Sequence, residues 1–211
     1  LLLGPKMTGI PYTAASSTAD ASSEDTTGSD DVVGELPRNE TLYFAGQQWG
    51  TVNSWNIIGT NQNNAMAIAA GAGYRTTMFE TLYMWNVMTG ELIGLLADGD
   101  YTWNDNMTEL SVNLKEAAHW SDGTPVTAQD FVYSWQRLAN PNTASPYASY
   151  LQYGHIVNID DIIAGKKPIT DLGVKALDEH TFEVTLSEPV PYFYKLLVHP
   201  SVSPVPKAAI E

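Results

Sequence analysis

The sequence predicts an α+β fold with mainly antiparallel strand pairing. Short β-rich runs at 101–103 and 109–114 flank an Asn-Asp-Asn turn, which is the pattern of a hairpin. Further short strand patterns lie at 173–176 and 181–186. A helical pattern at about 128–139 separates the two pairs of strands. Runs of strand interrupted by helix in this way favour α+β architecture.

The first third of the chain contains one expected strand, one loop and one helix-compatible stretch. Residues 41–45 form a short β-rich run after a Pro-Arg-Asn turn. Residues 47–64 are polar and rich in amides, with Trp49 and Trp55 and no sustained period, so we expect a long loop. Residues 65–84 are compatible with a helix apart from two glycines.

The central helix has clear start and stop signals. A turn cluster at 120–125 precedes Thr127, and Asp130 follows Thr127 at the spacing of a capping box. The residues expected on one apolar face are Phe131, Trp135 and Leu138. The Asn-Pro-Asn sequence at 140–142 ends the pattern, so the helix is predicted at 128–139.

Two shorter helices are expected nearer the C-terminus. Residues 156–163 form one pattern, which Gly165 closes. Residues 192–198 form an aromatic pattern bracketed by prolines.

Residues 1–36 differ in composition from the rest of the chain. The stretch 13–31 has no aliphatic residue larger than Ala, and the residues up to Glu35 include six acids and one base. Low hydropathy combined with like charge predicts a disordered Ser/Thr/Asp-rich tether.

Composition excludes several classes of function. The chain has 24 Asp+Glu against 10 Lys+Arg, a formal net charge of −14, so a nucleic-acid partner is not expected. It has no Cys, and its four His show no metal-ligand spacing. Neither a nucleotide-binding loop nor a nucleophile elbow is present. We therefore expect no catalytic residues, no metal and no cofactor.

Aromatic and amide side chains are abundant without any catalytic grouping. Such residues supply contact area and hydrogen bonds to neutral ligands, which is typical of a binding cleft. Trp49 and Trp55, both in the expected long loop, are the strongest candidates on this ground.

The stretch from Trp120 to Glu211, which begins WSDGTPVTAQDFVYSWQRLANPNTASPYASYLQYGH, resembles the oligopeptide-binding proteins of extracellular solute-binding protein family 5. These proteins serve ABC importers. The preceding MFETLYMWNVMTGELIGLLADGDYTWNDNMTELSVNLKEAAHW resembles the same family. The segment LPRNETLYFAGQQWGTVNSWN is closer to members that bind β-linked oligosaccharides such as cellobiose.

The resemblance implies a bilobed type II periplasmic-binding-protein fold, of which this chain carries the N-terminal part. By analogy, 37–79 is the first segment of domain I, and 80–204 is the smaller domain II with a mixed or antiparallel sheet and flanking helices. Residues 205–211 begin the return to domain I. Members of the family are more than twice this length, so the chain is expected to be truncated.

The resemblance also implies site residues and partners. It places a ligand-contacting Tyr in the motif SPYASY, which is Tyr147, and a ligand-facing His in LLVHP, which is His199. An acid that peptide-binding members use is missing near 67–70, so an oligosaccharide ligand stays open beside an oligopeptide. A truncated lobe that acts only as an interaction module is the other alternative. The expected protein is a monomer in the periplasm or outside the cell that delivers ligand to membrane permease subunits. A tether to the outer face of the cytoplasmic membrane is compatible with this location.

Overall fold

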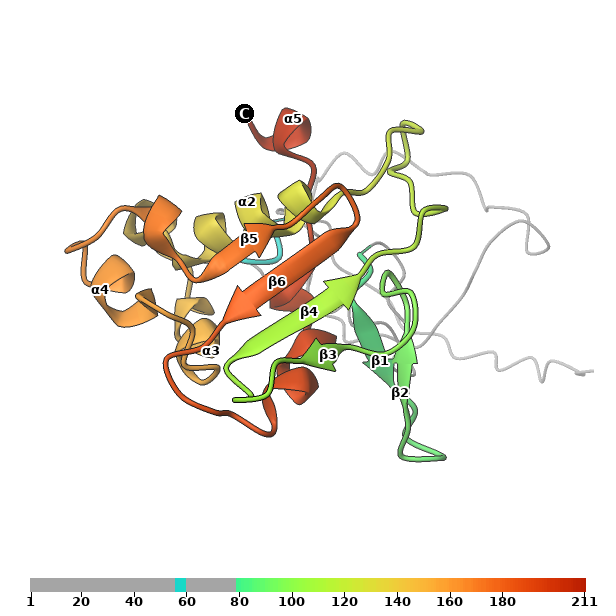
Figure 1. Cartoon of the computed structure of the whole chain (residues 1–211). Helices are drawn as coiled ribbons and strands as arrows, with labels where there is room; N and C mark the ends of the chain where they lie inside the picture. Colours follow the sequence, from blue (N-terminus) through green and yellow to red (C-terminus); the bar gives the residue numbers. More distant parts are fainter. Residues whose placement is uncertain (1–55, 60–78) are drawn as a thin grey trace, which may run out of the picture. The chain divides into compact units, whose positions relative to one another are not determined.

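The computed structural model describes residues 56–59 and 79–211, and its centre is a four-stranded antiparallel sheet of order β3-β4-β6-β5 (Figure 1). The strands are β3 (Thr102–Trp103), β4 (Glu109–Asn113), β5 (Val174–Ala176) and β6 (Thr181–Thr185). The predicted hairpin is confirmed, since β3 pairs with β4 in antiparallel register. The two later strand predictions are also confirmed, each within a residue of its observed ends.

Apolar side chains alternate with more polar ones along the strands, so the inner face of the sheet carries rows of apolar residues that are register partners. Leu110, Val184 and Val174 are register partners across β4, β6 and β5. The next inward row comprises Val112, Phe182 and Ala176. A strand directs alternate side chains to opposite faces, so a shift of one residue in register would expose both rows.

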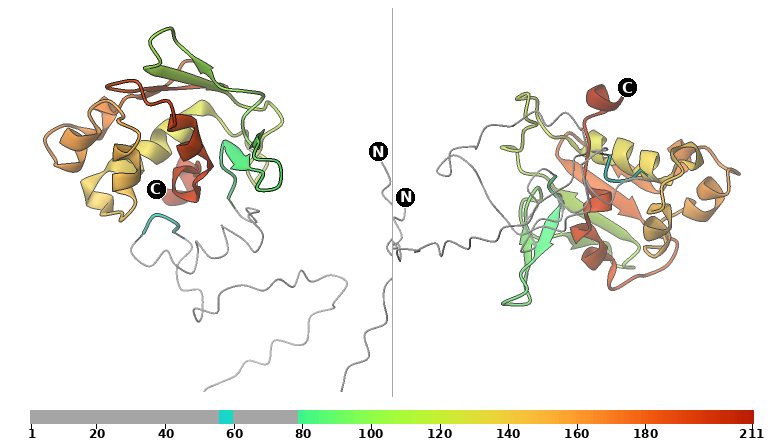
Figure 2. Two further views of the ribbon diagram at one scale, coloured as in Figure 1. Left: turned by 90° about the horizontal axis from the view of Figure 1, so that it is seen from below. Right: turned by 180° about the vertical axis from the view of Figure 1, so that it is seen from behind.

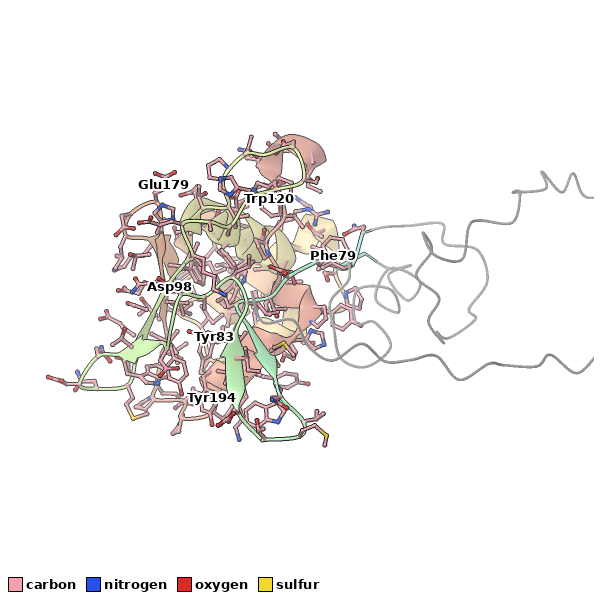
Figure 3. All side chains as sticks on the ribbon, turned by 90° about the vertical axis from the view of Figure 1, so that its right-hand side faces the viewer. Phe79, Tyr83, Asp98, Trp120, Glu179 and Tyr194 are labelled. Atoms are coloured by element: carbon pink, nitrogen blue, oxygen red, sulfur yellow. The ribbon has the colours of Figure 1, made fainter. Side chains whose placement is uncertain are left out.

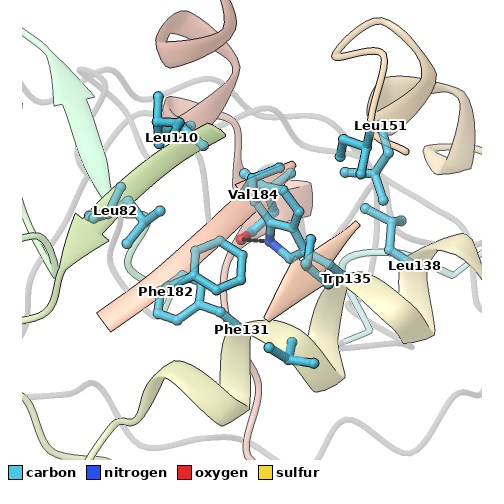
Figure 4. Packing of buried hydrophobic residues seen from close by; sticks show 14 of the residues in the cluster. Leu82, Leu110, Phe131, Trp135, Leu138, Leu151, Phe182 and Val184 are labelled. Carbon is cyan, nitrogen blue, oxygen red and sulfur yellow. Dashed lines mark hydrogen bonds between the residues drawn. The ribbon is translucent and has the colours of Figure 1, made fainter. Parts of the chain in front are cut away.

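Helix α2 (Ala128–Ala139) covers this inner face, as Figures 1 and 2 show. Phe131 and Trp135 both contact the ring of Phe182 on β6, with centroid distances of 5.4 Å and 5.1 Å. The Trp135 indole Nε1 donates a hydrogen bond of 3.0 Å to the carbonyl oxygen of Val202, drawn as a dashed line in Figure 4. The predicted apolar face of the helix is therefore confirmed, and it binds the C-terminal segment as well as the sheet.

Both ends of α2 follow the predicted signals. The Asp130 carboxylate accepts a hydrogen bond of 2.9 Å from the backbone N–H of Thr127, which satisfies a donor that the helix itself leaves free. The indole of Trp120, in the preceding turn, donates to the same carboxylate at 3.4 Å. At the other end, Asn140 has extended backbone angles, as a residue before proline must.

A second, two-stranded sheet was not expected from the sequence. It is a hairpin of β1 (Tyr83–Trp85) and β2 (Leu92–Gly94), paired antiparallel. The expectation that 65–84 is helix-compatible is wrong at its end, because Tyr83 and Met84 are in β1. Backbone bonds from Leu95 and Ala97 to the carbonyl of Leu82 hold the strand beside the core, so pairing overrides local helix propensity here.

The remaining elements are short helices. They are α3 (Ala148–Gln152), α4 (Ile159–Ile163), α5 (Lys207–Ile210) and the 3-10 turns η1 (Pro141–Thr143), η2 (Ile169–Asp171), η3 (Phe193–Val198) and η4 (Pro200–Val202). The helix predicted at 156–163 starts three residues later, after Asn158 in a left-handed conformation. The aromatic helix predicted at 192–198 is of the 3-10 type. No expectation covered α3.

Several predictions lie outside the described residues. These are the tether at 1–36, the strand at 41–45, nearly all of the loop at 47–64, and the stretch 65–78. Within that loop, only residues 56–59 are described, where Ile57 and Ile58 are buried in the core.

Replacing Trp135 by Phe tests the role of its indole. The change keeps an aromatic ring but leaves the buried Val202 carbonyl without its donor, and we expect a loss of about 1–3 kcal/mol in the free energy of unfolding. Urea denaturation of the chain, followed by circular dichroism, measures it. Trp103→Phe is the matched control, because the Trp103 indole has no hydrogen-bond partner among the described residues. Equal losses for the two variants would contradict the assignment.

Candidate ligand-binding site

Tyr147 and His199, far apart in the sequence, lie together in the structure. Tyr147 precedes the first residue of α3, and His199 joins η3 to η4. Their ring centroids are 5.5 Å apart. The ring of Tyr150, one turn along α3, is closer still to His199, at 4.3 Å with 31° between the planes. We call Tyr147, Tyr150 and His199 the aromatic–histidine cluster.

Close packing of α3 against η3 brings the cluster together. Gly154 follows α3, and a Cβ added there would lie 2.6 Å from the ring of Phe193, which is 1% exposed. Only a residue without a side chain permits this approach. The hydroxyl of Tyr150 also donates a hydrogen bond of 3.4 Å to the carbonyl of Leu196 in η3.

The imidazole of His199 is held in one orientation. Its Nδ1 accepts from the backbone N–H of Ser201 at 3.2 Å and lies 2.8 Å from the Ser201 hydroxyl. Because a backbone N–H can only donate, Nδ1 carries no proton, and the neutral ring has its proton on Nε2. Ser201 is 3% exposed, so its hydroxyl anchors the ring from inside. Among the described residues, none hydrogen-bonds to Nε2.

Two members of the cluster, His199 and Tyr150, are kept uncharged near pH 7 by burial. Burial lowers the pKa of His199 below 6.5, and burial raises the pKa of Tyr150 to about 12. The neutral rings offer apolar faces together with hydroxyl and Nε2–H groups. Such a surface is suited to a ligand with uncharged hydrogen-bonding groups.

The structure does not describe the other two predicted site residues. Trp49 and Trp55 lie outside the described residues, so their expected role stays a prediction. Tyr150 was not among the predicted site residues. Its spacing of three from Tyr147 in SPYASY was the available signal, because residues at that spacing share a helix face.

The described ranges offer nothing that would hold a metal ion: within 56–59 and 79–211, no three His, Asp or Glu side chains are grouped closely enough. In the same ranges, no helix combines the length and the apolarity required to cross a bilayer.

Comparison with protein families identifies the architecture. The family model described as Bacterial extracellular solute-binding proteins, family 5 Middle, matches residues 91–210, which is more than half of the chain. The chain belongs to this family. The resemblance of Trp120–Glu211 to family 5 is therefore confirmed, and the matched segment includes the four-stranded sheet, α2 and the aromatic–histidine cluster.

Individual family 5 proteins are similar over parts of their length. The periplasmic oligopeptide-binding protein OppA of Salmonella typhimurium is 82% identical over 108 residues, which is 51% of this chain and 20% of that protein. The probable deoxycholate-binding periplasmic protein YgiS of Escherichia coli is 52% identical over 178 residues, 83% of this chain and 32% of that protein. The chain thus spans about a fifth to a third of the length of these relatives.

Solved structures of family 5 proteins share the fold. Haemophilus influenzae OppA, in complex with the peptide RPPGFSPFR, superposes with a TM-score of 0.65 at 36% identity. The match covers 74% of this chain and 29% of that one. This confirms the expected α+β periplasmic-binding-protein fold. In the described part of this chain every strand pair is antiparallel, which decides between the mixed and antiparallel sheets that were expected.

Gly154→Ala tests how α3 and η3 are held together. The new methyl group would overlap Phe193, and we expect the free energy of unfolding to fall by about 1–3 kcal/mol. Phe193→Leu serves as the partner in a double-mutant cycle measured by urea denaturation. Because the smaller side chain makes room for the methyl group, the double variant should lose less than the sum of the two single losses. Strict additivity would contradict the close approach.

Acid should destabilise the chain through His199. The pKa of His199 is lowered in the folded state, so between 6.5 and that lower value the unfolded chain binds more protons. Stability is therefore lost as the pH falls through this window, and above it His199 adds no pH dependence. We expect wild type to lose stability relative to His199→Gln from about pH 7 to pH 5.

Two measurements check this pH dependence. Urea denaturation of both chains across the window gives the difference in stability, and an NMR titration of the His199 ring gives its pKa directly. A midpoint at or above 6.5 would contradict the lowered pKa.

Proposed function

We propose that this chain is part of the solute-binding component of an ABC importer, and that the component captures oligopeptides and delivers them to membrane permease subunits. The observation that carries the proposal is the 82% identity over 108 residues to a periplasmic oligopeptide-binding protein. The peptide bound to the Haemophilus influenzae relative supports the same ligand class.

The neutral aromatic–histidine cluster is suited to this ligand. A peptide main chain presents uncharged N–H and C=O groups that can pair with the Nε2–H of His199 and the hydroxyl of Tyr147. Recognition through main-chain groups is independent of the peptide's sequence, and side chains then need only roomy, hydrated pockets. We propose Tyr147, Tyr150 and His199 as ligand-contacting residues, with no chemistry of their own on the peptide.

The layout expected from the family is part of the proposal. Residues 37–79 would open domain I, 80–204 would form domain II, and 205–211 would return to domain I. The ligand would be enclosed between two lobes, which requires hinge closure. The names of the relatives place them in the periplasm, and we propose the same location for this monomeric component, with 1–36 as a tether.

A bile-acid ligand is the second candidate. The relative that covers 83% of this chain is named as a probable deoxycholate-binding protein. A rigid steroid would use the apolar ring faces of the cluster more than its hydrogen-bonding groups. The oligosaccharide alternative depends on Trp49 and Trp55 and stays a prediction.

Segment exchange tests the proposal in an intact binding protein. Residues 91–210 of this chain would replace the matching segment of the Salmonella typhimurium relative, and calorimetric titration with tripeptides would follow. We expect the dissociation constant of the hybrid for tripeptides to lie within about tenfold of that of the parent protein. Tyr147→Ala combined with His199→Ala in the hybrid should weaken binding by about 1–3 kcal/mol, because aromatic contact and a hydrogen bond are lost.

Tyr133→Ala is the matched control, because Tyr133 is an aromatic residue of α2 that contacts Lys207 rather than the cluster. A folded hybrid that binds no di- to pentapeptide would contradict the peptide proposal. Heat released by deoxycholate alone would favour the bile-acid candidate, and heat released by cellobiose alone would favour the oligosaccharide alternative.

A further inference from the structure

A second surface feature lies beside the β1–β2 hairpin, away from the aromatic–histidine cluster. It is a groove of about 600 Å³ between the hairpin and the chain around Tyr101 and Tyr194. In Figure 3, Tyr194 lies below Tyr83, beside the lower part of the hairpin. We call it the hairpin groove. Its lining includes the apolar and aromatic side chains of Trp85, Ile93, Tyr101 and Tyr194 and the carboxylates of Glu91 and Asp100.

The aromatic wall of the hairpin groove is rigid. The rings of Tyr101 and Tyr194 stack with centroids 5.2 Å apart and 16° between the planes. Tyr83 meets Tyr101 edge-on at 6.2 Å, and Trp103 does so at 6.5 Å. Since its neighbours fix Tyr101 on several sides, the wall is formed before any ligand arrives, which lowers the entropy lost on binding.

The hairpin wall is also ordered, although it projects into solvent. The Asn86 side-chain oxygen accepts hydrogen bonds from the backbone N–H groups of Met88 and Thr89, at 3.0 Å and 3.3 Å. Trp85 and Ile93 nevertheless stay 37% and 40% exposed. Large apolar side chains that remain this exposed on an ordered element mark a surface able to bind a partner or ligand.

Negative charge lines the same groove. Asp100 follows Gly99, whose carbonyl accepts a hydrogen bond of 3.3 Å from the Tyr83 hydroxyl, so the loop is tied to the hairpin. Within the described residues, no Lys, Arg or His forms an ion pair with Asp100 or Glu91. Two lysines lie nearby. The Nζ of Lys195 is 5.8 Å from the centroid of the Tyr194 ring, and the Nζ of Lys115 donates a hydrogen bond of 3.1 Å to the carbonyl of Gly94 in the hairpin. The aromatic wall thus already attracts an ammonium group of this chain.

We propose that the hairpin groove binds an organic cation, a guanidinium or alkylammonium group. The negative faces of aromatic rings attract such cations, and they do so best where carboxylates stand beside the rings. An anion would be repelled by Glu91 and Asp100, and a purely apolar ligand would leave both carboxylates without a partner. The groove shares no residue with the aromatic–histidine cluster, so this inference goes beyond the proposed function and does not rest on it.

The test compares two probes of the same shape. Propylguanidinium and the uncharged propylurea would be titrated into the chain, with chemical shifts of the Trp85 indole and the hairpin amides as the readout. We expect saturable millimolar binding of propylguanidinium that weakens with added salt, and no saturable binding of propylurea. Absence of propylguanidinium binding, or equal binding of both probes, would overturn the proposal.

Variants separate the charge from the rings. The double variant Glu91→Gln with Asp100→Asn should weaken propylguanidinium binding about three- to tenfold, because two nearby charges are removed. Asp98→Asn is the matched control, since Asp98 carries the same charge in the same loop but lines a different groove. Trp85→Leu should weaken binding and Trp85→Phe should restore part of it. If Asp98→Asn weakened binding as much as the double variant, binding would depend on the overall negative charge of the surface rather than on the two groove carboxylates. That result would overturn the proposal.

A blocked Gly-Arg-Gly peptide distinguishes the source of the cation. If the peptide binds more tightly than propylguanidinium and changes the chemical shifts of the same residues, the proposal is supported, and the natural ligand is an arginine side chain of a peptide. Equal binding would support it with a free organic cation as the ligand. Shifts confined to residues outside the groove would overturn it.

Discussion

The contact between α2 and β6 is the interaction on which the rest of the structure depends. Trp135 packs on Phe182 and also donates a hydrogen bond to the carbonyl of Val202, so a single side chain joins the sheet, the helix and the C-terminal segment. Ser134, beside it, accepts a bond of 2.8 Å from the backbone N–H of Val205. These contacts fix the chain just after His199. They add to the packing of α3 against η3, which also positions the imidazole.

From that anchor the chain presents two surfaces of different chemistry on either side of η3. The aromatic–histidine cluster lies at its C-terminal end, where burial keeps His199 and Tyr150 neutral. The hairpin groove lies where Tyr194 stacks on Tyr101, with exposed carboxylates beside the rings. Burial disfavours charge, and exposure permits it, so the short helix η3 separates the surface proposed for uncharged groups from the groove proposed for organic cations.

Much of the fold could be predicted because its signals are local. The capping residues of α2, the Asn-Asp-Asn turn of the β3–β4 hairpin and the alternation along β6 each act within a few residues. The β1–β2 hairpin could not be predicted in this way. Tyr83 and Met84 suit a helix as well as a strand, and pairing with a segment beyond a loop decided the outcome. The same holds for α3, which is too short to show a period.

The sequence by itself determined the family and the position of the main helix, and it singled out Tyr147 and His199 as candidate site residues. Only the tertiary structure decided that these two rings meet, that Tyr150 joins them, and that the proton of His199 is on Nε2. The reason is physical: ring contacts, burial and the choice of tautomer depend on segments that are distant in the chain and close in space. The hairpin groove has the same origin, because its rings and carboxylates come from separate elements that no local pattern connects.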